Sequence, residues 1–148
     1  MRCVLVTGAA GFIGSHTSLV LLNAGYKLFL LDNFSNSSPI ALTRVAGLSQ
    51  LSKNEVEERI SIIKGDIRDL SLLERIFSTA KSQGEQITSV IHFAGLKSVE
   101  ESEENPLLYW DVNVGGATSL FRVMEANHCR TLVFSSSATI YGPSSEAT

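Results

Sequence analysis

Short runs of apolar residues alternate along the chain with longer stretches in which apolar residues recur every three or four positions. The short runs suit strands that are covered on both faces, and the longer stretches suit half-buried helices. This alternation is typical of βαβ units around a parallel sheet. The predicted strands are Cys3–Val6, Lys27–Leu31, Ile60–Lys64, Ser89–His92 and Thr131–Ser135. The predicted helices are Phe12–Ala24, Pro39–Leu51, Leu70–Gln83 and Pro106–Asn127.

The connections between these strands predict the topology of the sheet. Because crossovers between parallel strands are right-handed in almost every known case, the connections favour the strand order 3-2-1-4-5. A ligand then binds in the crevice at the carboxyl ends of the strands, where the winding reverses. We therefore predict an α/β fold with a Rossmann-type doubly wound parallel sheet, of which residues 1–148 hold the N-terminal five strands.

The composition limits the range of partners. Charged residues make up 18% of the chain and its net charge is −3, so we expect no basic surface for a nucleic-acid backbone or an anionic membrane. No apolar run approaches the roughly 20 residues of a membrane-spanning helix, and Thr7-Gly8 interrupts the apolar N-terminus before a signal-peptide core could form. We expect a cytoplasmic protein with no nucleic-acid or membrane partner.

The histidines and cysteines predict no metal site. His16 and His128 are spaced too far from any cysteine or carboxylate partner to suggest metal ligation. His92, at a predicted strand end, is interpreted as a packed or capped histidine and not as an acid or base. Cys3 and Cys129 would lie in or beside strands, and we expect them to be buried thiols and not a disulfide.

A glycine-rich turn follows the first predicted strand. The sequence Thr7-Gly8-Ala9-Ala10-Gly11-Phe12-Ile13-Gly14 has the spacing G-x-x-G-x-x-G, and its last glycine opens a helix. Gly8 permits a tight turn, Gly11 lets a pyrophosphate approach the backbone, and Gly14 lets the helix pack close to the strand. The helix N-terminus offers unpaired N–H groups and a partial positive charge to phosphates. Taken alone, such a turn is also compatible with an ordinary strand-to-helix connection.

An acidic residue at the end of the second predicted strand favours a dinucleotide site. Asp32 follows Gly14 by 18 residues, close to the spacing at which such sites place a carboxylate that binds the adenosine ribose hydroxyls. A carboxylate repels the 2′-phosphate of NADP, so the predicted cofactor is NAD. Arg44 is the nearest arginine that could pair with a 2′-phosphate. The alternative for Asp32 is a helix-cap or turn residue. For Gly65-Asp66-Ile67, after the third strand, adenine contact and a plain turn remain equally open.

Four stretches resemble a known protein family. Val6–His16 resembles the opening of extended short-chain dehydrogenases/reductases. Asp32–Ser37, His92–Val99 and Phe134–Gly142 resemble, within that group, the UDP-galactose (UDP-glucose) 4-epimerases. The run Ala94-Gly95-Leu96-Lys97 is the most discriminating, because related nucleotide-sugar dehydratases and decarboxylases usually carry other residues there. The resemblance covers the whole chain.

The resemblance implies roles for individual residues. Asp66 and Ile67 would hold the adenine, Ser135 would lie beside the nicotinamide, and Ser137 would be catalytic, bonding the sugar hydroxyl that loses its hydride. From the residues alone, a run of serines leaving a strand is more often a backbone cap, and a single lysine in a loop is usually solvated. The predicted cofactor-binding residues are Gly8, Gly11, Phe12, Ile13, Gly14, Asp32, Asn33, Asn36, Ser37, Asp66, Ile67, Phe93, Ala94, Gly95, Lys97, Asn113 and Ser135.

The resemblance also implies the reaction. UDP-galactose and UDP-glucose would be interconverted by hydride transfer from C4 of the hexose to NAD⁺ and back to the other face of a 4-keto sugar. The family uses a tyrosine and a lysine spaced as Tyr-x-x-x-Lys on one helix face, a pair that these 148 residues do not contain. We therefore expect an N-terminal NAD-binding part without the substrate-binding C-terminal region and without meaningful turnover. The full-length enzyme would be a homodimer with a UDP-hexose substrate.

Two alternatives remain open. The chain could be a stand-alone NAD-binding module, or it could belong to an epimerase of another UDP-sugar, such as a UDP-N-acetylhexosamine or a UDP-hexuronate. The last predicted helix carries apolar residues that we expect to form core along one side, and the resemblance implies a dimer interface here. The glutamates from Glu100 to Glu104 predict a solvated face. The apolar residues of that helix are Leu107, Trp110, Val114, Phe121 and Met124.

Overall fold

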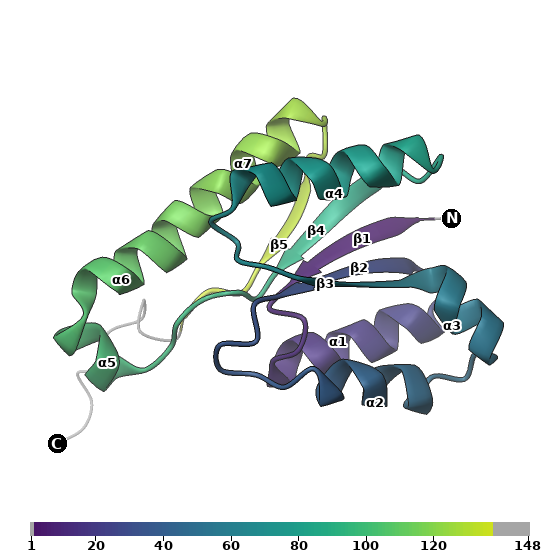
Figure 1. Cartoon of the computed structure of the whole chain (residues 1–148), viewed down its shortest axis with the longest axis horizontal. Coiled ribbons are helices and arrows are strands. Elements are labelled where there is room, and N and C mark those ends of the chain that lie inside the picture. Colours follow the sequence, from purple (N-terminus) through teal and green to yellow (C-terminus); the bar gives the residue numbers. More distant parts are fainter. Residues whose placement is uncertain (1, 138–148) are drawn as a thin grey trace, which may run out of the picture.

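The structure, a computed structural model, describes residues 2–137. Within them a parallel sheet of five strands lies between two layers of helices (Figure 1). The strands are β1 (Cys3–Thr7), β2 (Lys27–Asp32), β3 (Ile60–Lys64), β4 (Ile87–His92) and β5 (Thr131–Phe134). The helices are α1 (Phe12–Asn23), α2 (Ile40–Leu48), α3 (Lys53–Arg59), α4 (Leu70–Ser82), α5 (Val99–Glu104), α6 (Pro106–Trp110), the π-helical turn η1 (Asp111–Gly115) and α7 (Gly116–Ala126).

The strand order is β3-β2-β1-β4-β5, which confirms the predicted topology and the α/β fold class. All neighbouring strands are parallel, and Thr7 at the end of β1 pairs with Leu31 of β2 and His92 of β4. The carboxyl ends of the three central strands therefore meet at one edge of the sheet. The loops that leave these ends build the site described below.

The two faces of β1 and β2 supply two separate cores. Side chains alternate across a strand, so Cys3 and Leu5 pack with residues of α4 and α7, while Val4 and Val6 pack with residues of α1 and α2. Figure 1 shows these two helix pairs on opposite sides of the sheet. Every residue of β1 and β2 is buried, as predicted for strands covered on both faces.

The same expectation is wrong for the outer strands. In β3 the side chain of Ile62 is 51% exposed, and in β5 those of Val133 and Phe134 are 54% and 51% exposed. These strands stand at the two ends of the sheet formed by the described residues, so each has a strand neighbour on one side only. An apolar run predicts a strand but does not say what covers it.

Two short helices were not predicted. The expected helix Pro39–Leu51 ends at Leu48, and α3 follows after Ser52. Ser52 and Glu55 form a capping box, in which the Ser52 side chain accepts from the Glu55 N–H while the Glu55 carboxylate accepts from the Ser52 N–H. The acidic stretch forms α5, capped by Ser98, and its glutamates are exposed as predicted.

The expected helix Pro106–Asn127 is interrupted by the π-helical turn η1. The prediction of which of its residues are buried in the core is largely wrong. Met124 is buried, but Leu107 is 83% and Trp110 is 68% exposed. Val114 and Phe121 are exposed as well. A π turn holds one extra residue, which rotates the following α7 by about 100° relative to a continuous α-helix. The buried side of α7 is formed instead by Gly116, Ala117, Leu120, Val123 and Met124.

Candidate functional site

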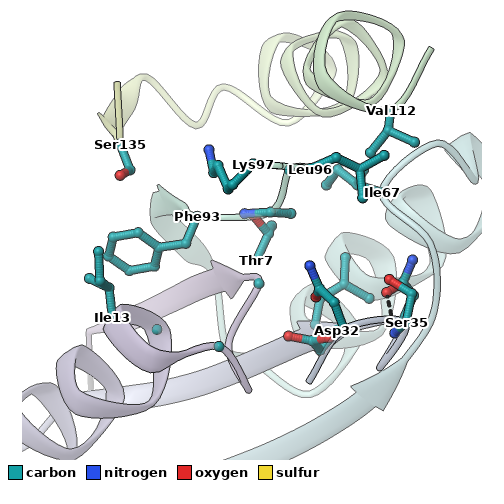
Figure 2. A pocket seen from close by; sticks show the side chains of 18 of the residues that line it. Thr7, Ile13, Asp32, Ser35, Ile67, Phe93, Leu96, Lys97, Val112 and Ser135 are labelled. Carbon is teal, nitrogen blue, oxygen red and sulfur yellow. Dashed lines mark hydrogen bonds between the residues drawn. The ribbon is translucent and has the colours of Figure 1, made fainter. Parts of the chain in front are cut away.

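A cavity of about 320 Å³ opens at the carboxyl ends of β1, β2 and β4, where the sequence predicts the ligand crevice. This volume is in the range of small-molecule and cofactor sites. Figure 2 shows Lys97 and Ser135 on one side of the cavity and Asp32 and Ser35 on the other. The lining residues are Thr7, Gly8, Gly11, Phe12, Ile13, Gly14, Leu31, Asp32, Asn33, Ser35, Asn36, Gly65, Ile67, Phe93, Ala94, Gly95, Leu96, Lys97, Val112 and Ser135.

The glycine-rich turn, residues 7–14, forms one wall of the cavity. Gly8 has a φ of +66°, and a Cβ there would lie 2.6 Å from the backbone nitrogen of Ala94. A Cβ on Gly14 would overlap the carbonyl oxygen of Gly8. The structure thus confirms the tight turn at Gly8 and the close packing of α1 that Gly14 permits.

The N-terminus of α1 lies at this wall. Gly11 is the N-cap residue, and no side chain caps the first turn of the helix. Phe12, Ile13 and Gly14, which form that turn, all line the cavity. Because the first N–H groups of a helix have no partner within it, this end of α1 can bind an anion.

Asp32, the last residue of β2, joins the turn to the β2–α2 loop and is only 7% exposed. Its carboxylate accepts hydrogen bonds from the N–H of Ala10 at 2.8 Å, the N–H of Phe34 at 2.9 Å and the hydroxyl of Ser37 at 2.8 Å. The bond to Phe34 makes Asp32 a turn residue, which was the alternative interpretation, and the same side chain lines the cavity. A carboxylate has about four acceptor positions, so roughly one remains for a ligand.

The loop after β3 carries an ion-pair network. Asp66 accepts hydrogen bonds from Nε of Arg68 at 2.9 Å and Nη2 at 2.8 Å, and from Nδ2 of Asn33 at 3.4 Å. Hydrogen bonding to Arg68 lowers the pKa of Asp66 to about 2. Arg68 also donates to Asp111, the first residue of η1, at 2.6 Å. Asp66 does not line the cavity itself, but its neighbours Gly65 and Ile67 do.

The loop after β4, residues 93–97, forms the facing wall. The N–H of Phe93 donates to the Thr7 carbonyl at 3.0 Å. Farther along, the carboxamide of Asn113 binds the backbone of Leu96 twice: Oδ1 accepts from the Leu96 N–H at 2.8 Å, and Nδ2 donates to the Leu96 carbonyl at 3.1 Å. Asn113 therefore lies behind the wall, and its neighbour Val112 lines the cavity.

The ends of β4 and β5 close the third side. His92 is buried, with Nδ1 2.6 Å from the Thr7 hydroxyl and its ring 5.3 Å from that of Phe134. Burial, with a smaller effect of the Lys97 charge, lowers the pKa of His92 to about 4, so the side chain is a packed neutral histidine at pH 7. Ser135 lines the cavity, whereas Ser137 is exposed and does not. The rest of the serine motif, residues 138–142, lies outside the described residues.

Both cysteines of the chain lie within residues 2–137. There, no group of three or more His, Cys, Asp or Glu side chains is placed to hold a metal ion. No helix in this part of the chain is long and apolar enough to cross a membrane. Cys3 and Cys129 are buried as predicted, and burial raises the pKa of both thiols.

Comparison with known proteins places the chain in a family. The family model described as GDP-mannose 4,6 dehydratase matches residues 5–148. The chain belongs to the NAD-dependent epimerase/dehydratase family of extended short-chain dehydrogenases/reductases. Among curated members, UDP-glucose 4-epimerase 4 of Oryza sativa subsp. japonica is 49% identical over 141 residues, which are 95% of this chain and 36% of that protein.

Solved structures of epimerases superimpose on the fold. UDP-glucose 4-epimerase from Bifidobacterium longum, in complex with NAD⁺ and UDP, has a TM-score of 0.83 and 43% identity over 95% of this chain and 38% of that one. The enzyme from Stenotrophomonas maltophila, with bound NAD and formylated UDP-arabinopyranose, has a TM-score of 0.84 and 34% identity over 99% of this chain and 40% of that one. The chain thus spans a little over a third of these relatives and is homologous to their N-terminal, NAD-binding part.

Most residues predicted from the motifs of this epimerase/dehydratase family line the cavity. Ser37, Asp66, Asn113 and Ser137 do not, although the first three are hydrogen-bonded to residues that line it. Several lining residues were missed because they lie inside or beside a motif without carrying its characteristic chemistry. Val112 had no local signal at all, because the long-range contact of η1 brings it to the cavity. The lining residues outside the predicted set are Thr7, Leu31, Ser35, Leu96 and Val112, together with Gly65, for which the sequence leaves adenine contact and a plain turn equally open.

Proposed function

We propose that the chain is the N-terminal, NAD-binding part of a UDP-glucose 4-epimerase, which interconverts UDP-galactose and UDP-glucose by hydride transfer at C4 through a 4-keto sugar. One observation carries the proposal: the glycine-rich turn and the Asp32 carboxylate line a single cavity, in a chain about half identical to such epimerases. The complex of the Bifidobacterium longum epimerase with NAD⁺ and UDP supports the choice of cofactor and substrate class.

The residues of the cavity fit a dinucleotide. The uncapped start of α1, with Gly11 at its N-cap, would hold the pyrophosphate, because it offers N–H groups and no side chain intervenes. Asp32 would accept hydrogen bonds from the adenosine ribose. Ile67, 5% exposed, would contact the adenine beside Asp66, whose ionised carboxylate can only accept hydrogen bonds.

The charge of Asp32 favours NAD over NADP. Its carboxylate already accepts three hydrogen bonds from the protein, so a second ribose hydroxyl would replace one of them. The Ser37 hydroxyl is the donor that can rotate away, whereas the N–H groups of Ala10 and Phe34 belong to the backbone. A 2′-phosphate would instead meet a buried negative charge.

The nicotinamide half of the cofactor would lie toward the β4–β5 side of the cavity. NAD⁺ supplies the hydride acceptor when it is bound. Phe93, Ala94 and Lys97 would line the path to the nicotinamide ribose, and Ser135 would lie beside the ring. Ser137 would hydrogen-bond the C4 hydroxyl of the sugar. Proton removal is assigned to no residue of this chain, since its 148 residues contain no Tyr-x-x-x-Lys pair.

We extend the proposal to the whole protein as a homodimer that acts on a UDP-hexose. The apolar side chains on α6 and α7 fit an interface, because Leu107, Trp110 and Phe121 are exposed there. Sedimentation of the natural protein should give twice the mass of one chain. A monomer would contradict this part of the proposal and leave the cofactor assignment standing.

The test of the cofactor assignment is a titration of wild type and Asp32→Ala with NAD and NADP. We expect the wild type to prefer NAD, and the variant to bind NAD roughly 10- to 100-fold more weakly while its preference over NADP narrows, because a hydrogen bond to a charged group contributes about 1.5–3 kcal/mol. Asp69→Ala is the matched control, since Asp69 caps α4 through the Leu72 N–H and does not line the cavity. A wild-type protein that does not bind NAD would overturn the proposal.

A further inference from the structure

The π-helical turn η1 reaches both loops that border the cavity on the β3 and β4 sides. Asp111 accepts from Arg68 of the loop after β3, and Asn113 binds Leu96 of the loop after β4. Between them, Val112 lines the cavity. Turns with the i→i+5 bonding of η1 occur as single bulges in α-helices and are frequent at functional sites.

Both polar atoms of the Asn113 carboxamide bind the backbone of one residue, Leu96, in the loop after β4. Its Oδ1 and Nδ2 pair the N–H and the carbonyl of Leu96, at 2.8 and 3.1 Å. An asparagine amide bound in this way copies the pairing of a neighbouring strand, and it fixes both the position and the direction of the Leu96 peptide groups. The loop residue is 17 positions earlier in the chain, so the contact is tertiary.

Gly95 makes this contact possible. A Cβ at Gly95 would lie 3.0 Å from Oδ1 of Asn113 and 3.3 Å from Nζ of Lys97. The amide, the glycine and the lysine are therefore packed together without room for another carbon. Because Gly95 and Lys97 flank Leu96, holding the Leu96 peptide groups also holds the two neighbours that line the cavity.

We infer that Asn113 is a positioning residue of the dinucleotide site, whose carboxamide fixes the Leu96 backbone and thereby sets where Gly95 and Lys97 meet the cofactor. The inference rests on the proposed function. Asn113 affects cofactor binding through the loop and not by touching the cofactor, since its amide binds Leu96 and does not line the cavity. Without the amide, the loop has to be ordered when the cofactor binds, and this ordering weakens affinity.

The first experiment is a calorimetric NAD titration of the purified natural protein and of Asn113→Ala. We expect the variant to bind NAD about tenfold more weakly, the order of effect that loop ordering has on binding. Asn127→Ala is the matched control: the Asn127 amide is also half-buried and donates to a helix carbonyl, that of Val123 at 2.9 Å, but at the far end of α7. It should bind NAD as the wild type does.

A double-mutant cycle separates positioning from general destabilisation. If Asn113 acts by placing Lys97, the loss caused by Asn113→Ala should largely disappear in a Lys97→Met background. Additive losses would overturn the inference. Should Asn113→Ala fail to fold, Asn113→Asp takes its place in the cycle, because it keeps the side-chain size and the acceptor for the Leu96 N–H while losing the donor to the Leu96 carbonyl.

The outcomes distinguish the inference from the function on which it rests. A wild type that does not bind NAD removes the proposed function, and the inference with it. A wild type that binds NAD, with an Asn113→Ala variant that binds equally well, overturns the inference alone. Hydrogen exchange adds a direct readout: the Leu96 amide should exchange faster in Asn113→Ala and unchanged in Asn127→Ala, and an unchanged rate in both would contradict the contact.

Discussion

The glycine-rich turn (residues 7–14) and the loop after β4 (residues 93–97) face each other across one cavity, but different parts of the chain hold them in place. The turn is fixed by packing within itself, since Gly14 packs on the Gly8 carbonyl, and by the hydrogen bond from the Ala10 N–H to Asp32 at the end of β2. The loop is fixed from a distance, by Asn113 of η1. Substitutions in the turn should therefore disturb the fold itself, whereas substitutions that release the loop should mainly weaken binding.

The largest effect is expected from Gly14→Ala. The new methyl group would overlap the backbone carbonyl of Gly8, which cannot move without shifting α1, so we expect a loss of about 3 kcal/mol in the free energy of unfolding. Urea unfolding measures this. Gly47→Ala is the matched control, because a Cβ at Gly47 of α2 meets nothing within 4 Å. It should stabilise the protein by up to about 1 kcal/mol, as alanine does in helices. Equal effects of the two substitutions would show that the packing of Gly14 against the Gly8 carbonyl does not hold the turn.

The next largest effect is expected where the end of β4, just before the loop of residues 93–97, contacts the glycine-rich turn. His92 of β4 lies against the Thr7 hydroxyl, and burial lowers its pKa from 6.5 to about 4. As the pH falls, His92 is therefore protonated in the unfolded chain before it is protonated in the folded one. The contribution of the neutral His92 to the free energy of unfolding is fully present above pH 6.5 and is lost as the pH drops toward 4. We expect unfolding at pH 4.5 to require about 2 kcal/mol less than at pH 7.

Replacing the two histidines one at a time checks this assignment. Unfolding of His92→Gln should show much less of the pH dependence, because the titrating group is gone. His16→Gln, in which an exposed histidine of α1 is replaced, should keep the wild-type slope. A slope that survives in His92→Gln would mean that another group couples these regions to pH.

The smallest effect is expected from Arg68→Met. Arg68 links Asp66 to Asp111 of η1, but its side chain is 37% exposed, so solvent screens the pair and we expect a loss of only about 1 kcal/mol in stability. The pKa of Asp66 is lowered to about 2, so its contribution is present above about pH 4 and is lost as the pH falls through 2. Acid unfolding of the variant should accordingly be less steep between pH 4 and 2. A loss as large as that of Gly14→Ala would show that a contact between distant segments supports the fold as strongly as the packing inside the turn does.

Sequence reasoning predicts best those features that depend on local patterns of residues and on general rules of chain geometry. The strand order, the tight turn at Gly8 and the packing at Gly14 follow from apolar runs, glycine geometry and the handedness of crossovers, and the structure has all of them. The Ser-x-x-Glu spacing of the capping box at Ser52 and Glu55 is a local signal of the same kind, but the predicted elements include no helix there.

Long-range packing determines the features that sequence reasoning missed. Nothing near Val112 indicates that it lines a cavity, because η1 and the loop after β4 meet only in the folded chain. The exposure of Trp110 and Val133 was missed for a related reason: apolar character predicts that a residue favours burial, but not that another element covers it. The contact between Asn113 and Leu96 is long-range as well, because the two residues are 17 positions apart in the chain.

The pairing of β1 also orders the events of folding. One edge of β1 pairs with β2, so Cys3 meets Lys27, while the other edge pairs with β4, so Thr7 meets His92. The first pairing can form early in synthesis on the ribosome. The second has to close a loop of more than eighty residues, which is slow because the chain loses the conformational entropy of that loop before the contacts form. Until the second pairing forms, the loop after β4 does not face the glycine-rich turn, so the cavity is incomplete. We therefore expect the nascent chain to acquire its affinity for a dinucleotide only after β4 has paired with β1.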